Sequence, residues 1–543
     1  MSDRESSEPI KWRKLACQGN WLKLPLLLLP ISLMLICYPD AITQDGPAHL
    51  ASGKIANELI AGKPVVKSVY QLQLKPLPNW AGQAAAMLAL QILPEKAANC
   101  LLNLLGLWLP ALALNWLAQS FDQRSTCESW ARPLWISISG MNVVWLFGFT
   151  SFLIGLAFAW VMIGLTWRSL ERKTLLFLIL TTLGWCLLFL SHLVAYALAG
   201  IIFGVILACY FLARDTKTGL KLAATTIPSL FLLINYRRIT GGTKLELIWE
   251  HLDWSNLTSL GNWARQIGWI DPVSLASKRW VPMLDTEKSW AIFIQPVLWL
   301  AIAAGLIIYK TGNDFFRGQR PAYPPFFLAW VLISLIGLLG PDTLGKDQGH
   351  YLPQRVCLAA MGLFCLTWPA TISPTITRLL VSAWVLQVFF CTVFITESCE
   401  MAREIRAMRT GIRPGSKVVA IFDTTPWPFR PNPRLHRDAL LVFAGDDIAS
   451  FNLYEAGHAY FPLQFQYLTE GLEPERLEQI SLMRSEADLV DRTAEIGLTL
   501  KSAETYAETI VILGEPETAF YRIVIEILNE MQLDESQVQV LPE

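Results

Sequence analysis

The chain has 543 residues, of which 53% are hydrophobic and only 16% are charged. A soluble domain carries about 25% charged residues, so the composition excludes an ordinary soluble protein. The formal net charge of −1 gives no reason to expect a nucleic acid as partner.

Apolar runs about as long as a membrane-crossing helix recur along the chain. We predict eleven spans, at roughly 21–39, 97–118, 133–148, 151–167, 174–190, 193–212, 222–236, 290–309, 324–340, 353–369 and 377–396. The first run is long enough to span and lacks a small-residue cleavage site, so we expect no cleavable signal peptide. The seventh run is the shortest on this reading.

Lys and Arg gather in the N-terminal tail, 1–20, and in the short connections after the fourth, sixth and eighth runs. Cytoplasmic loops carry such an excess, so this side is predicted to be cytoplasmic. The transmembrane domain, 21–396, then has outer loops at 40–96 and 237–289. Eleven spans place residues 397–543 outside.

Charge rises after Glu397, and the apolar runs shorten to strand length. We expect strands at 417–423, 509–513 and 538–541, and an amphipathic helix at 518–532. The predicted fold class is therefore an α-helical polytopic membrane protein with a small C-terminal α/β domain outside the membrane.

A carboxylate and an imidazole lie one helical turn apart where the chain leaves the first span, in the sequence from Gln44 to Leu50. Asp45 is a candidate general base, and His49 would share its helix face. The alternative is that Asp45 only caps a helix beginning at Pro47. Asp40 is a second candidate carboxylate at the same boundary.

We expect two further residues, Trp80 and His192, to border an outer-facing cavity beside Asp45. Trp80 follows a Pro-rich segment and either anchors the chain at the interface or stacks on a sugar. His192 ends the fifth span, where an ionisable side chain is either functional or a satisfied interfacial His.

Candidate anion-binding residues lie in the two later outer connections. Arg355 falls at the start of the tenth span, where it either snorkels or binds a phosphate with its guanidinium fork. Its neighbours Lys346, His350 and Tyr351, and the pair Arg237 and Arg238 at the start of the second outer loop, complete this set.

The tail and the cysteines give weaker signals. The segments 445–447 and 452–458 hold possible metal ligands, but a turn with exposed acids is the commoner explanation. The ten Cys show no metal-ligand spacing, so no metal site is predicted from them.

The order of one span, an acidic outer loop with the Pro-rich segment before Trp80, about ten further spans and the Arg-bearing start of the tenth resembles the GT-C superfamily of membrane glycosyltransferases. That superfamily includes protein O-mannosyltransferases, aminoarabinose transferases and RgtA/B/C/D-like transferases. The resemblance implies a polyprenyl-phosphate sugar donor, a glycan, lipid or protein acceptor, and Asp45 as the base. It also implies a location in a membrane, with a bacterial inner membrane favoured, and leaves a divalent metal possible as cofactor.

Two other functions fit a polytopic chain. A transporter usually places ionisable residues near mid-membrane, whereas here they crowd one rim. A non-catalytic scaffold that presents the C-terminal domain would need no acid at position 45.

Overall fold

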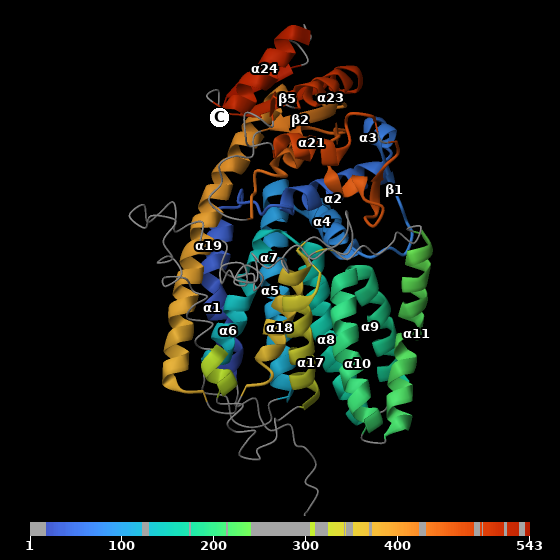
Figure 1. Ribbon diagram of the computed structural model, residues 1–543, viewed down its shortest axis with the longest axis vertical. Helices are drawn as coiled ribbons and strands as arrows, with labels where there is room; N and C mark the ends of the chain where they lie inside the picture. Colours follow the sequence, from blue (N-terminus) through green and yellow to red (C-terminus); the bar gives the residue numbers. More distant parts are fainter. Residues whose placement is uncertain are drawn as a thin grey trace, which may run out of the picture.

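The structure, a computed structural model, describes residues 18–121, 130–172, 175–212, 215–239, 304–309, 324–341, 343, 351–368, 372–422, 431–467, 469–482, 489–490, 492–514, 518–531 and 538–542. Helices dominate it (Figure 1), and a small sheet lies at one end.

The first half of the chain contributes α1 (Gln18–Cys37), α2 (Gly46–Ile60), α3 (Pro64–Val69), β1 (Tyr70–Leu72), α4 (Trp80–Ile92), α5 (Glu95–Phe121), α6 (Ala131–Gly140), α7 (Val143–Leu146), α8 (Thr150–Arg172), α9 (Leu175–Ser191), α10 (Leu193–Leu212) and α11 (Thr216–Ile239). The second half contributes α17 (Pro324–Leu339), α18 (Leu352–Phe364), α19 (Pro374–Met408), β2 (Lys417–Phe422), β3 (Ala449–Ser450), α20 (Tyr454–Gly457), β4 (Leu463–Phe465), α21 (Pro474–Ser481), α23 (Thr493–Tyr506), β5 (Thr509–Gly514), α24 (Ala519–Met531) and β6 (Val538–Pro542). Short 3-10 helices cover Arg409–Gly411 (η1) and Arg437–Ala444 (η2).

The count of eleven spans is wrong for the described part of the chain. Five helices there are long and apolar enough to cross a bilayer, as in a helical membrane protein: Glu95–Ser120, Thr150–Trp167, Leu193–Leu212, Thr216–Ile239 and Pro374–Gly411. Four apolar helices are shorter: Leu22–Cys37, Leu175–Ser191, Pro325–Leu339 and Leu352–Phe364. At 1.5 Å per residue, fewer than about 18 residues fall short of a hydrocarbon core about 30 Å thick, although α1 as a whole, Gln18–Cys37, has 20 residues and reaches that length. The eighth predicted span lies outside the described residues except for 304–309.

The run at 133–148 shows why apolar length alone misleads. It forms two short helices, α6 and α7, because the Asn142 side chain accepts a hydrogen bond from Trp145 N at 3.0 Å and donates one to the Ser139 carbonyl at 2.5 Å. An Asn that caps a helix in this way starts a new one. Every residue of α6 except Arg132 is buried, so this helix does not face lipid along its length.

The first outer loop and the tail form one unit at the same end of the bundle (Figure 1). Strand β1 pairs antiparallel with β4, with Tyr70 opposite Phe465. The Asp447 carboxylate accepts hydrogen bonds from the first backbone amides of α3, Val65 N at 3.1 Å and Val66 N at 2.9 Å. Lys54 of α2 donates to two carbonyls of the tail. The start of the loop therefore packs on the tail, whereas α4, in the same loop, packs against α5 and α8 of the bundle.

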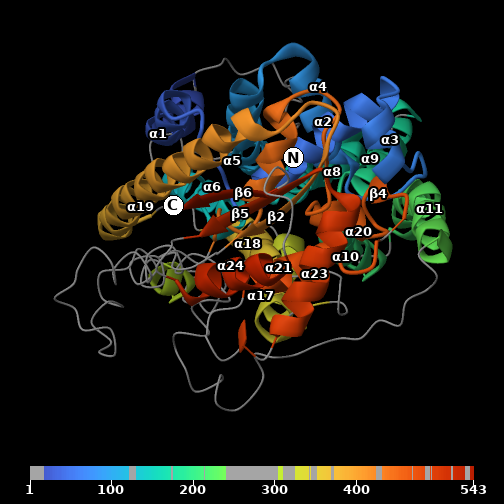
Figure 2. The same ribbon diagram turned by 90° about the horizontal axis from the view of Figure 1, so that it is seen from above.

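The tail contains the expected strands in a four-stranded parallel sheet of order β3-β2-β5-β6. Because successive strand residues point to opposite faces, Val419 and Ile421 pack with α21, α23 and α24, whereas Val418 and Ala420 pack with the end of α19. Figure 2 shows these helices along the two sides of the strands. Both faces are covered, as in other parallel sheets.

Helix α19 crosses the predicted domain boundary at 396/397 without a break. Ser373 accepts a hydrogen bond from Ile376 N at 3.4 Å at its start, and the helix continues to Met408. Its apolar first part lies in the bundle, and its last turns pack Ile405 and Met408 under the sheet. A continuous helix joins the bundle and the tail without a linker.

The connection between α10 and α11 lies at the end of the bundle opposite the tail (Figure 1). We therefore expect single cysteines at Lys217 and Glu504, in a background without other Cys, to be labelled from opposite sides of the membrane. An impermeant maleimide should label Glu504→Cys in intact cells and Lys217→Cys only after permeabilisation. Labelling of both from the same side would overturn this topology.

Candidate functional site

The segment between α1 and α2 is attached to the turn that precedes α8. Gln44 N donates to the Leu146 carbonyl at 3.2 Å, and Asp45 N donates to the Phe147 carbonyl at 2.9 Å. Gly148 has a φ of +80°, and a Cβ there would lie 2.4 Å from Thr43 Oγ1. Only glycine fits this close approach. The base candidate therefore has a fixed backbone position above the bundle.

Asp45 occupies the residue before α2, but its side chain makes no capping hydrogen bond. The carboxylate instead accepts a hydrogen bond from Tyr454 OH at 3.0 Å and one from Gln44 Nε2 at 3.3 Å. Tyr454 donates to Oδ2, and His436 Nε2 lies 3.7 Å from Oδ1, the oxygen that accepts from Gln44. The alternative that Asp45 only caps the helix is thus wrong, and the carboxylate faces the tail domain.

The surroundings of Asp45 suit a base at neutral pH. Burial raises its pKa from 3.8 to about 6, and the charge of His49 and the hydrogen bonds from Tyr454 and Gln44 limit the rise. Burial and the nearby carboxylates raise the pKa of Tyr454 well above its usual value, so this phenol remains a donor. Burial lowers the pKa of His436 to about 3, which keeps that imidazole neutral.

His49 lies in the first turn of α2 and forms an ion pair through Nδ1 with the Glu455 carboxylate of α20. Ser52 Oγ donates to the other oxygen of the same carboxylate. Glu455 is only 2% exposed. A loop residue and a tail residue that are about four hundred positions apart thus share a buried ion pair.

Arg355 approaches from the bundle. It follows Tyr351, whose φ of +56° puts a non-glycine residue in the left-handed region at the start of α18. The guanidinium carbon lies 4.0 Å from the ring centroid of Phe149 and 5.7 Å from that of Phe152. Its Nε is buried without a hydrogen-bond partner among the described residues. Arg355 interacts electrostatically with Asp45.

His192, between α9 and α10, lies at the same end. Its Nδ1 accepts a hydrogen bond from Val194 N at 3.2 Å, so the neutral ring carries its proton on Nε2. The ring meets Phe152 edge-on, with centroids 5.3 Å apart. Asp45, His49, His192 and His436 each expose 7% or less of their surface, so they form one enclosed cluster with Arg355.

The other predicted site residues lie elsewhere. Asp40 is held in an ion-pair cluster by Lys96 at 3.0 Å and by Arg406 and Arg403 of α19. Trp80 begins α4 and donates to the Lys75 carbonyl at 3.3 Å. The remaining candidates are Arg237 and Arg238, both exposed at the end of α11, and Lys346 and His350, which fall outside the described residues.

Sequence reasoning missed His436 and Tyr454, and it set aside Glu455 as part of an exposed acidic turn. Tyr454 lies 409 residues from its partner Asp45. His436 stacks on the Tyr454 ring with centroids 4.4 Å apart. No local pattern in the tail indicates these contacts. The one local signal is that two aromatic and two ionisable residues occur within residues 454–460.

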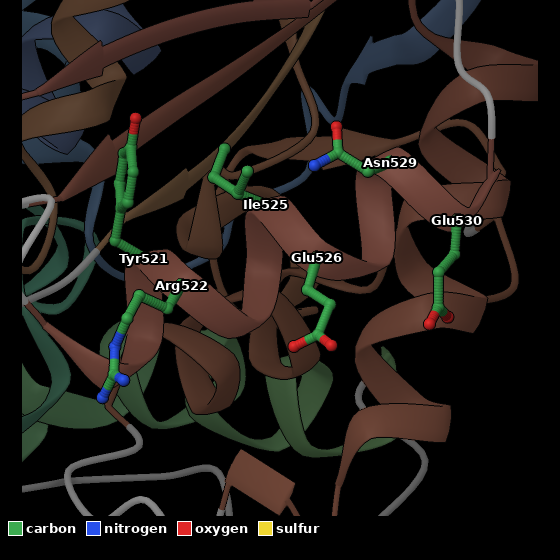
Figure 3. A pocket seen from close by; sticks show the side chains of 6 residues that line it. All are labelled: Tyr521, Arg522, Ile525, Glu526, Asn529 and Glu530. Atoms are coloured by element: carbon green, nitrogen blue, oxygen red, sulfur yellow. The ribbon is translucent and has the colours of Figure 1, made fainter.

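The described residues offer no group of three or more His, Cys, Asp or Glu side chains that would hold a metal ion. A separate shallow depression on α24 is lined by Tyr521, Arg522, Ile525, Glu526, Asn529 and Glu530 (Figure 3). All of these residues come from one helix, and none contacts the Asp45 cluster in the interactions described above.

No model of a known protein family matches this chain, and no protein of curated function matches it in sequence.

Burial of Asp45 should cost stability when this group is ionised. A carboxyl group with a folded pKa of about 6 and an ordinary value of 3.8 favours the neutral folded form, so the cost is absent below about pH 4 and complete above pH 6. We expect Asp45→Asn to raise the free energy of unfolding in detergent at pH 7.5 by at most about 3 kcal/mol, which is measured as a higher melting temperature. This advantage should disappear near pH 4.

Asp40→Asn is the matched control. It removes the carboxylate that Arg406 and Lys96 share, so it should lower stability by about 2 kcal/mol at pH 7.5. A variant at Asp45 that melts below the wild type at pH 7.5 would contradict the assignment of Asp45 as a strained buried acid.

Proposed function

We propose that the protein is a membrane glycosyltransferase that moves a sugar from a polyprenyl-phosphate donor to an acceptor hydroxyl at the outer face of the membrane. The observation that carries the proposal is that two suitable groups lie in one cluster. Asp45 has a buried carboxylate that makes no capping hydrogen bond, and Arg355 has a guanidinium whose Nε is buried without a partner among the described residues. A base and an anion-binding cation are the two groups that this reaction requires.

The proposed chemistry is a single displacement with inversion. The acceptor oxygen attacks the anomeric carbon as its proton passes to Asp45, and the bond from that carbon to the phosphate oxygen breaks. The polyprenyl phosphate leaves with the bonding electrons. Arg355 stabilises the charge that grows on this phosphate, because its guanidinium interacts electrostatically with Asp45 but forms no ion pair with a carboxylate of the described residues.

The tail residues around Asp45 support the role of base. Tyr454 and Gln44 donate to the carboxylate and hold it in one orientation. Neutral His436 lies near Oδ1 of the Asp45 carboxylate, and it adds no competing positive charge. A base with a pKa of about 6 is ionised at neutral pH and still accepts a proton effectively.

The location of the cluster also argues for a lipid donor. The bundle supplies Arg355 and His192 from the ends of apolar helices, and the tail supplies Tyr454 and His436. A donor with a phosphate at headgroup depth and a chain in the bilayer would meet such a site from the membrane. Transport and scaffolding leave the buried, strained carboxylate of Asp45 without a role.

Loss of the base should abolish transfer. We expect Asp45→Asn to reduce turnover by about 10²–10⁴-fold, while Asp40→Asn retains specific activity once the folded fraction is corrected for. The assay is release of polyprenyl phosphate from a panel of polyprenyl-phosphate hexoses and pentoses in membranes that contain the acceptor.

In the same assay, wild-type kcat/KM should rise as pH increases through about 6 and then level off, because Asp45 must be ionised to act. Turnover by Asp45→Asn near the wild-type level would show that Asp45 is not the base and would move that role to Asp40.

Arg355 should contribute to both donor binding and turnover. Lys at this position keeps the charge but loses the planar fork, so we expect weaker binding in Arg355→Lys and still weaker binding in Arg355→Ala, by about tenfold at each step. Binding of a polyprenyl-phosphate analogue to the three purified proteins measures this. Equal affinities would show that Arg355 only packs on Phe149 and Phe152.

A further inference from the structure

We infer that Glu455 of the tail is a positioning residue: it holds the His49 ring so that Nε2 of His49 and the guanidinium of Arg355 together bind the phosphate of a polyprenyl phosphate, which is a diester in the sugar donor and a monoester once the sugar has left. The inference rests on the proposed function for the identity of that phosphate as part of the lipid donor. It assigns to the tail domain a part in donor binding.

The contacts of Glu455 fix the imidazole from one side. One carboxylate oxygen pairs with His49 Nδ1, and the other accepts from Ser52 Oγ one turn further along α2. Because Nδ1 is committed to this carboxylate, Nε2 is the only ring nitrogen left for a ligand. A carboxylate that orients an imidazole through Nδ1 is a general way to fix the function of Nε2.

Two donors in the enclosed cluster lack partners. No described residue hydrogen-bonds to His49 Nε2, although His49 is more than nine-tenths buried. Of these two donors, Arg355 Nε is itself fully buried without a partner among the described residues. A buried donor left unpaired costs free energy, and an anion with several acceptor oxygens would pair with both.

The charge of His49 depends on its neighbours. Burial alone lowers the pKa of His49, but its neighbouring carboxylates, Glu455 foremost, together outweigh this effect, and the net pKa is raised above 6.5. Asp45 on the same turn also favours the imidazolium, whereas Arg355 of α18 opposes it. His192 of the bundle and His436 of the tail face the same cluster, and the charge of His49 disfavours their own protonation.

The test is the pH dependence of phosphate binding to the full chain in detergent, with a polyprenyl phosphate as probe and inorganic phosphate as competitor. In the wild type Glu455 keeps His49 charged between pH 5.5 and 8, and the ionisation of Asp45 and of the probe phosphate in this range affects wild type and variant alike, so affinities are compared at each pH. In Glu455→Gln the imidazole should lose its proton within this range. Affinity should then fall about tenfold at pH 8 while remaining near the wild-type value at pH 5.5.

Three further variants separate positioning from folding. Glu455→Asp should restore part of the affinity at pH 8, and His49→Gln should bind weakly at every pH. Glu504→Gln, an exposed acid on α23, should match the wild type. Equal binding by Glu455→Gln and wild type at pH 8 would overturn the inference, and so would a loss that is the same at all pH values.

The outcome is independent of sugar transfer. If the binding pattern holds but no polyprenyl-phosphate sugar is consumed, the phosphate site stands and the glycosyltransferase proposal fails. If inorganic phosphate binds as tightly as the polyprenyl phosphate, a free phosphate is the ligand. If the wild type binds neither probe, the phosphate site itself is refuted.

Discussion

The docking of α20 on the first turns of α2 is the contact on which the rest of the site depends. It brings Glu455 onto His49 and Tyr454 onto Asp45, and so joins residues about four hundred positions apart. Around it, Ala48, Ala51 and Ile55 of α2 enter the apolar core of the tail. Burial of this apolar surface offsets the cost of enclosing the ionisable groups, which would otherwise favour separation of the two parts.

The protein uses arginine in two opposite ways near the same membrane boundary. Arg406 forms ion pairs with Asp40 at 2.5 Å and with Glu95 at 2.9 Å, and the resulting cluster joins α19 to the start of α5. Arg355 is packed on aromatic rings, which hold the guanidinium flat without using its N–H donors. An arginine that is paired with carboxylates stabilises the fold, whereas an arginine without such an ion pair can bind an anionic ligand.

The same contrast applies to the two candidate acids. Asp40 forms ion pairs with Lys96 and Arg406, whereas the Asp45 carboxylate is buried and accepts hydrogen bonds from neutral donors, and its pKa is raised to about 6. Functional sites often keep such unfavourable groups because the surrounding fold supplies the stability that they lose. The structure thereby separates two carboxylates that sequence position alone made nearly equivalent.

The sequence by itself determined the features that depend on local composition. Apolar runs indicated the helical bundle, the strands of the tail followed from short β-branched runs, and ionisable residues at the ends of apolar runs marked one rim, including Asp45, His49, His192 and Arg355. Only the tertiary structure decided where the helices end and which side chains contact each other across the chain. Asn142 divides an apolar run through its own capping hydrogen bond, and α19 continues past a change in composition because its polar turns pack under the sheet. The partners of Asp45 and His49 came from the distant tail, since contacts between residues so far apart depend on how whole elements dock and not on any local pattern.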